Sequence, residues 1–136
     1  MSNLSTTDTA THFYGVIYSD VTDKKETREM AVRTIFKKGT TIPCEISETL
    51  YTLYRGQNSV KIILTQSMED TSDPEFVIVV HEGIFKLPKG RPANQPIKAT
   101  YRYTENSTME AEFLDINSGR VYIPKGGNTA ATLSRG

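Results

Sequence analysis

Two segments near the C-terminal end alternate between apolar and polar residues, which is the pattern of a β-strand with one buried face. They are residues 97–104, Ile-Lys-Ala-Thr-Tyr-Arg-Tyr-Thr, and residues 108–116, Thr-Met-Glu-Ala-Glu-Phe-Leu-Asp-Ile. Opposed residues of an antiparallel pair share a face, so the apolar residues of one segment must lie opposite those of the other. The resulting register pairs Tyr103 with Met109, Tyr101 with Ala111 and Arg102 with Glu110.

This register leaves a three-residue loop, Glu105-Asn106-Ser107, between the two strands. Such loops place their last residue in the left-handed region, which a serine adopts only at some cost. We therefore expect slight backbone strain at Ser107. Residues 117–120, Asn-Ser-Gly-Arg, predict a second turn in which Gly119 supplies the positive φ.

Further strand patterns run along the rest of the chain, and no segment carries a helical stripe. Residues 45–54 and 58–66 predict a β-hairpin around Arg55-Gly56-Gln57, with Pro43 at a strand end or edge. Residues 76–80 are a continuous apolar run that favours a strand covered on both faces, with a bulge at Gly83. Residues 12–19 and 29–37 are two further strands. About eight strands joined by short turns predict an all-β, antiparallel β-sandwich.

The 136 residues are enough for about one domain with its own core. We expect a folded domain over residues 10–124, a flexible N-terminal segment over 1–9 and a flexible tail over 125–136. Sixteen basic residues balance sixteen acidic ones, which argues against a nucleic-acid or membrane partner. The chain has neither a membrane-spanning apolar run nor a secretion signal, so we expect a cytoplasmic domain. The single cysteine, Cys44, excludes an internal disulfide and a cysteine-based metal site.

Several motifs together resemble one known family. The motif Gly-Thr-Thr-Ile-Pro at residues 39–43 leads into the two strands of the predicted hairpin. Gly-Arg-Pro follows at residues 90–92, Pro-Ile-Lys-Ala-Thr-Tyr at 96–101, and Asp-Ile-Asn-Ser-Gly-Arg at 115–120. In this order and spacing they resemble the substrate-binding β-domain of the heat shock protein 70 (DnaK-type) molecular chaperones, and the resemblance covers nearly the whole folded region.

The resemblance implies a domain that captures extended apolar peptide segments of unfolded proteins. In the family, main-chain hydrogen bonds hold the peptide and a pocket accepts one apolar side chain, which is recognition of an extended chain. The backbone contacts would fall at Val16, Ile17, Tyr18 and Ser19 and at residues 51–53. The pocket would be lined by Val16, Leu50, Val60, Ile62 and Ile97. Gln57 would bond the peptide backbone, and Ser19 and Leu53 would form the arch over the peptide.

The chain also departs from the family pattern. Residues 20–28 make the first hairpin about nine residues longer than is usual in the family, Ser19 replaces a large apolar arch residue, and Tyr51 replaces a small groove residue. Of the linker that joins the family's domain to its ATPase domain, only Asp8 is in place. We expect neither the family's ATPase domain nor its helical lid among these residues.

These departures bear on the chemistry that we expect. The domain itself should need no cofactor and should not be an enzyme, since ATP and Mg would belong to the ATPase domain of a full-length parent. That ATPase domain would be a partner within the same parent chain. His12, His81 and Cys44 form no spaced metal or catalytic pattern. The alternative function is a chaperone-fold sandwich that has lost its groove and acts as a protein-interaction or adaptor module. Exposed edge strands would also allow weak self-association.

Overall fold

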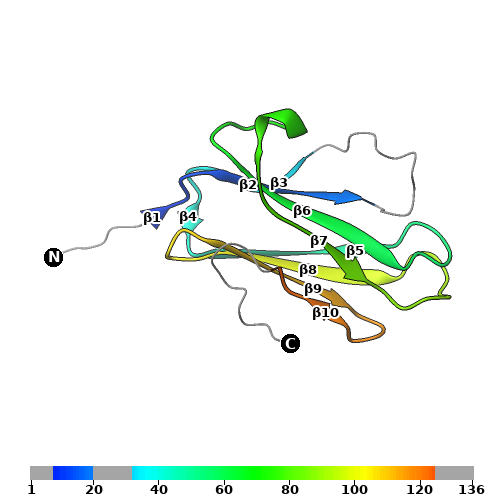
Figure 1. The fold of residues 1–136 in the computed structure, drawn as a ribbon. Coiled ribbons are helices and arrows are strands. Elements are labelled where there is room, and N and C mark those ends of the chain that lie inside the picture. The colour runs from blue at the N-terminus through cyan, green and yellow to red at the C-terminus, as the bar shows by residue number, and fades with distance from the viewer. Residues whose placement is uncertain (1–7, 20–31, 125–136) are drawn as a thin grey trace.

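The computed structural model describes residues 8–19 and 32–124. Apart from one 3₁₀ turn at Pro74–Phe76, the regular elements of the described residues are ten β-strands, which pair in antiparallel fashion (Figure 1). The strands are β1 (Asp8–Thr9), β2 (Phe13–Ser19), β3 (Arg33–Phe36), β4 (Thr41–Ile42), β5 (Cys44–Tyr51), β6 (Ser59–Ser67), β7 (Ile78–Lys86), β8 (Pro96–Tyr103), β9 (Met109–Asp115) and β10 (Val121–Tyr122). The predicted all-β sandwich is confirmed. No helix among the described residues is long and apolar enough to cross a membrane.

Two four-stranded sheets form the layers of the sandwich, and the short strands β1 and β4 pair with each other beside them (Figure 1). One sheet has the order β3-β2-β6-β7 and the other has the order β10-β9-β8-β5. Every second residue of the central strands points between the sheets, because side chains alternate along a strand. The resulting core contains Val16, Phe36, Val60, Ile62, Leu64, Phe85, Ile97, Ala99, Tyr101, Tyr103 and Phe113, among others.

The register predicted for the C-terminal strand pair is confirmed. In β8 and β9, Tyr103 lies opposite Met109, Tyr101 opposite Ala111 and Arg102 opposite Glu110. Ser107 has φ +64° and Gly119 has φ +82°, as the two loop patterns predict. The strands expected at 12–19 and 29–37 correspond to β2 and β3, which pair with each other.

The prediction of a hairpin between residues 45–54 and 58–66 is wrong. Both strands exist, as β5 and β6, but they lie in different sheets: β5 pairs with β8, whereas β6 pairs with β2 and β7. The connector, residues 52–58, therefore crosses from one layer of the sandwich to the other. A short loop is compatible with both arrangements, and the choice between them depends on which distant strands offer complementary faces.

The prediction that residues 76–80 are covered on both faces is also wrong. Phe76 ends the 3₁₀ turn, in which Asp73 Oδ1 accepts a hydrogen bond from Glu75 N at 2.9 Å. Ile78, Val79 and Val80 begin β7, which is an edge strand of its sheet, and their side chains are exposed. An apolar run thus marks a strand here but not its burial.

The bulge expected at Gly83 lies three residues earlier. His81 pairs with Leu64 and Val79 pairs with Thr65, so Val80 is the extra residue, whereas Gly83 pairs regularly with Ile62. Gly83 is needed for a different reason, because a Cβ at this position would collide with the Tyr122 hydroxyl. The absent side chain makes room for the aromatic ring of β10.

The N-terminal strand begins earlier than the start expected for the folded domain at residue 10. Asp8 and Thr9 of β1 pair with Ile42 and Thr41 of β4, and Ala10 is buried. The backbone Ala10 N donates a hydrogen bond to Thr40 O at 2.7 Å. The long first hairpin predicted at residues 20–28 lies outside the described residues.

Candidate peptide-binding surface

The strands that carry the residues assigned to peptide binding meet at one end of the sandwich, at the right of Figure 1, where β2 and β5 end and β6 begins. Strand β2 ends at Ser19, which lies opposite Lys61 near the start of β6. Strand β5 ends at Tyr51, opposite Pro96 at the start of β8. Residues 52–58 join β5 to β6 at this same end, so strands from both sheets and the loop between them meet there.

The five residues assigned to the pocket are packed within the core. Val16, Ile62 and Ile97 are at most 2% exposed, Val60 is also buried, and the partly buried Leu50 packs against them. They come from four strands, β2, β5, β6 and β8, and the two sheets bring them together. Their side chains thus belong to, or pack against, the one hydrophobic core cluster of the domain.

Large apolar side chains are exposed at this end, on and beside the inter-sheet loop, together with the charged Arg55. Leu53 is 77% exposed and Tyr51 is 57% exposed, and Tyr54 is exposed as well. Tyr18 and Ser19 at the end of β2 are half-buried, and Ile17 is buried. Exposed large apolar side chains on a single connecting loop form a surface that another apolar chain can cover.

Gln57 holds the inter-sheet loop in its conformation. Its side-chain Oε1 accepts a hydrogen bond from Leu53 N at 2.7 Å, and its Nε2 donates to Ser59 O at 3.0 Å. Gln57 N also donates to Tyr54 O at 3.2 Å, closing a turn in which Gly56 has φ +83°. Because the amide oxygen and the amide nitrogen of the buried Gln57 side chain both bond to nearby backbone, Gln57 fixes the backbone position of the exposed Leu53.

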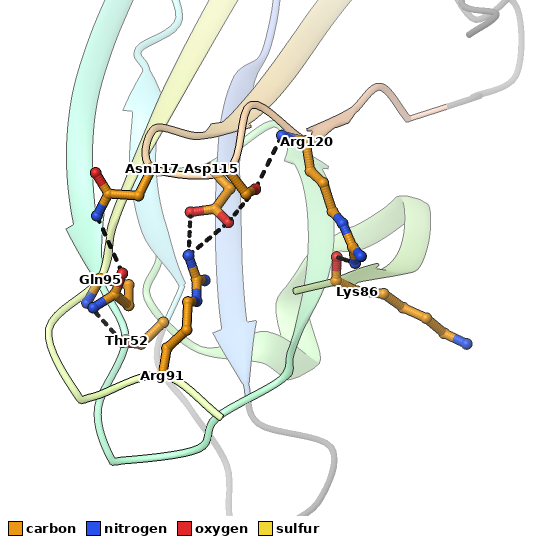
Figure 2. Close-up of polar contacts among 8 residues, drawn as sticks. Thr52, Lys86, Arg91, Gln95, Asp115, Asn117 and Arg120 are labelled. Atoms are coloured by element: carbon orange, nitrogen blue, oxygen red, sulfur yellow. Dashed lines mark hydrogen bonds and ion pairs between the residues drawn. The ribbon is translucent and has the colours of Figure 1, made fainter. Parts of the chain in front are cut away.

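A second set of contacts ties the same loop to its neighbours (Figure 2). Thr52 N donates to Gln95 O at 3.0 Å, Asn94 N donates to Thr52 O at 3.0 Å, and Gln95 N donates to Thr52 Oγ1 at 2.8 Å. Gly56 N donates to Arg91 O at 2.7 Å. The backbone on either side of Leu53 is therefore fixed before any ligand arrives, which lowers the entropy cost of binding.

An ion pair inside this end of the sandwich joins the segment between β7 and β8, which contains Arg91, to the turn that follows β9 at Asp115 (Figure 2). Through the bond from Gly56 N to Arg91 O, the connector of residues 52–58 is tied to the same pair. Arg91 Nη1 lies 2.9 Å from Asp115 Oδ2, and the Asp115 side chain is 0% exposed. The Ser118 hydroxyl donates to the same carboxylate at 2.6 Å, and Gly119 N donates to Asp115 O at 2.8 Å. Sequence reasoning singled out the Gly-Arg-Pro and Asp-Ile-Asn-Ser-Gly-Arg motifs but did not pair their charged residues.

A polar cluster between the sheets holds Tyr18 in place. Its hydroxyl donates to Glu48 Oε2 at 2.9 Å and contacts the hydroxyl of Tyr101, and Arg33 Nη2 donates to Glu48 Oε1 at 2.6 Å. Burial raises the pKa of Tyr18 and that of Tyr101 far above the usual range, so both hydroxyls stay protonated. These residues lie on β2, β3, β5 and β8, and sequence analysis could not connect them because each belongs to a different strand.

A cavity of about 490 Å³ lies at the opposite end of the sandwich. It is lined by Pro43, Cys44 and Glu45 from one side and by residues 102–106 from the other. Burial raises the pKa of the partly buried Cys44 thiol above its ordinary value. Within residues 8–19 and 32–124, no group of three or more His, Cys, Asp or Glu side chains is placed to hold a metal ion.

Comparison of the chain with models of protein families and with curated protein sequences found no match.

Proposed function

We propose that this chain is a peptide-binding domain of the heat shock protein 70 type, which captures extended apolar segments of unfolded polypeptides at the β2, β5 and β6 end of the sandwich. The observation that carries the proposal is the exposed apolar surface of Leu53 and Tyr54 on a rigid inter-sheet loop and of Tyr51 at the end of β5 beside it. The motifs at residues 39–43, 90–92, 96–101 and 115–120 support the same assignment.

Peptide capture at this loop would combine the burial of apolar surface with backbone hydrogen bonds. An extended apolar segment that covers Leu53 and Tyr51 removes apolar surface from water, worth about 25 cal/mol per Å² before ordering costs. The peptide backbone also needs hydrogen-bond partners. Strand β2 pairs with β6 along residues 13–19 but with β3 only as far as Val16, so among the described residues one side of residues 17–19 has no strand partner. Residues 17–19 therefore supply the main-chain contacts in this proposal, since Val16 is paired on both sides, and Leu53 supplies the apolar contact.

The backbone groups of residues 51–53 contribute less than the resemblance implies. Thr52 N, Thr52 O and Leu53 N already bond to Gln95, Asn94 and Gln57 within the domain. A peptide would have to displace these bonds to use the same groups. We assign the backbone recognition to β2 for this reason, and to the loop the role of an apolar wall.

A second function, that of an adaptor module without peptide capture, is favoured by one observation. Val16, Ile62 and Ile97, which should line an open pocket, are buried against one another in the core. In the adaptor proposal the same exposed loop contacts a folded protein partner and needs no pocket for a single side chain. The two proposals differ in whether a short unstructured peptide binds.

The test is a titration of the domain into a fluorescently labelled heptapeptide with leucine at its centre, followed by fluorescence anisotropy. Peptide capture predicts saturable binding near 1 μM, about −8 kcal/mol. Replacing the central leucine by aspartate should abolish it. Leu53→Asp should weaken binding by at least tenfold, because it places a charge in the apolar contact.

The matched control is Phe76→Asp, which introduces the same charge at a side chain that is 68% exposed, on the turn before β7. β7 begins at the end of the sandwich opposite to the loop, since Ile78 pairs with Gln66 near the end of β6. This variant should bind within twofold of the parent. Equal affinity of the Leu53→Asp variant would refute the location of the site, and absence of binding by the folded domain would favour the adaptor function.

A further inference from the structure

Strand β7 presents an unpaired edge, and the backbone groups that point outward can be assigned. Among the described residues its only strand partner is β6. Leu87 N donates to Asn58 O on the β6 side at 2.9 Å, and backbone groups alternate in direction along a strand. The N–H and C=O groups of Glu82, Ile84 and Lys86 therefore point away from β6. The bond from Arg120 Nη1 to Lys86 O, 3.3 Å long and drawn in Figure 2, agrees with this assignment.

The regular part of this edge is bounded on both sides. The bulge at Val80 interrupts the strand before His81, and Pro88, which has no N–H, follows Leu87. The edge available for pairing is therefore residues 81–87, and its midpoint is Ile84. Along it, the side chains of Glu82, Ile84 and Lys86 are exposed on the outer face of the sheet, and Ile84 is 45% exposed.

We propose that β7 pairs with β7 of a second copy of this chain, antiparallel and about a two-fold axis at Ile84, so that the two sheets form one continuous sheet. In this register Ile84 lies opposite Ile84 of the second copy. Glu82 lies opposite Lys86 of the second copy, and the reverse pair forms by symmetry. Each of these residues then exchanges its outward backbone hydrogen bonds with the residue opposite.

Charge complementarity selects the second copy as the occupant of this edge. Charged side chains on an edge strand usually prevent pairing. Here the two charges have opposite signs and stand at equal distances from the midpoint, so a two-fold axis brings each against its opposite. Opposed pairs of this kind stabilise a sheet, whereas like charges directly opposite destabilise it.

Neighbouring registers of the two β7 strands are less favourable, because they bring the bulge, the proline or like charges into the paired segment. Moving the axis by one residue brings Val80 or Pro88 of one copy into the ladder, opposite Lys86 or Glu82 of the other. Moving it by two residues places Glu82 opposite Glu82 or Lys86 opposite Lys86. The carbonyl of Lys86 can accept a bond from the second copy while keeping that from Arg120, because a carbonyl oxygen has two lone pairs.

The paired edge is separate from the candidate peptide-binding surface. Strand β6 lies between β7 and β2, and Leu53 is on the loop that enters β6 from the other sheet. Tyr51, at the end of β5, and Leu53, on the connector, are thus not residues of the paired strand. Peptide binding and self-association can consequently be measured as independent properties, and the failure of one does not imply the failure of the other.

The experiment is sedimentation equilibrium of the full chain from micromolar to millimolar concentration. We expect a reversible monomer–dimer equilibrium. Lys86→Glu should weaken the dimer by at least tenfold, because it places a glutamate opposite Glu82 of the second copy. The double variant Glu82→Lys/Lys86→Glu should restore the dimer, because the exchange regenerates both opposite-charge pairs.

Two controls keep the result interpretable. Lys98→Glu makes the same change of charge at an exposed residue of β8, outside the paired edge, and should leave the dimer unchanged. Circular dichroism confirms that each variant is folded; loss of the exposed Lys61–Glu82 pair, 2.9 Å long, costs at most about 1 kcal/mol. A chain that stays monomeric throughout, a dimer insensitive to Lys86→Glu, or a double variant without rescue would overturn the proposal.

Discussion

Removing the Arg91 guanidinium should destabilise this domain more than any surface substitution. The Arg91 side chain is 15% exposed and the Asp115 side chain is fully buried, so the pair is shielded from water. Arg91→Met keeps most of the aliphatic volume but leaves the Asp115 carboxylate with the Ser118 hydroxyl as its remaining side-chain partner among the bonds described. Leaving one member of a buried pair uncompensated costs about 3–5 kcal/mol.

The magnitude is large compared with the stability of a domain of this size, which is about 5–15 kcal/mol. The variant should therefore fold, with a clearly lower urea midpoint. Asp115→Leu should also be destabilising, because it leaves the guanidinium unpaired and removes the bond from Ser118. The double variant should be less destabilised than the sum of the two, by about 1–3 kcal/mol, because neither charge is then left alone.

Urea unfolding followed by far-ultraviolet circular dichroism measures all three variants, since urea does not screen charges and the chain has no tryptophan. Arg102→Met is the matched control. Arg102 makes exposed ion pairs with Glu45 and Glu110, so its loss should cost less than about 1 kcal/mol. A cost below 1 kcal/mol for Arg91→Met, or additive effects in the double variant, would refute the view that this pair anchors the loops.

Three further predictions concern the strands and turns. Burial raises the pKa of Tyr18 and Tyr101 above the ordinary tyrosine value of 10.0, so the unfolded chain loses these protons first as the pH rises. The free energy of unfolding should be steady below about pH 10 and fall above it by about 1.4 kcal/mol per pH unit for each tyrosine. The fall should be shallower in the Tyr18→Phe variant. Urea midpoints measured between pH 8 and about pH 11.5 would show both effects. Ser107→Gly should raise the free energy of unfolding by about 1 kcal/mol, because glycine adopts φ +64° without strain; an unchanged or lower urea midpoint would contradict this. Gly83→Ala should lower the melting temperature by crowding the Tyr122 hydroxyl, at a cost of about 1–3 kcal/mol, and should cost much less in a Tyr122→Ala background; an equal cost in both would show that another contact is responsible.

The local features of this fold were predictable because they depend on neighbours in the sequence. Alternation along β8 and β9 indicates which side chains face the core, and it sets their register once the loop is short. The left-handed conformation at Ser107 follows from that register, and that at Gly119 follows from its turn. In each case a few adjacent residues contain all the information that the stereochemistry requires.

Predictions that needed a distant partner failed where the sequence offered no way to choose it. The strands β5 and β6 were recognised as strands, but their assignment to different sheets depends on pairing with β8 and with β2 and β7. The apolar start of β7 looks like an interior strand, and it is exposed because no further strand among the described residues lies beyond it. Pairing and burial are properties of the assembled sheet, and a single strand does not encode its position within it.

In the candidate site, too, the contacts between distant residues were not predictable from the sequence. Resemblance alone assigned Val16, Val60 and Ile62 to a shared pocket, and the two sheets do bring them together, although as part of the core. The buried bonds of Gln57 and the Arg91–Asp115 pair were not predicted, because each joins residues whose separation in space is set by the packing of loops.

By itself, then, the sequence determined that this protein is a chain of antiparallel strands, which faces of those strands are apolar, and where the backbone must turn. These are consequences of side-chain alternation and of allowed φ values, which act over a few residues. Only the tertiary structure decided that β5 and β6 pair with strands of different sheets, that β7 is an edge, and that Leu53 stands exposed on a rigid loop between the sheets. The reason is that pairing and burial are selected by the total free energy of the packed sandwich, to which residues far apart in the sequence contribute together.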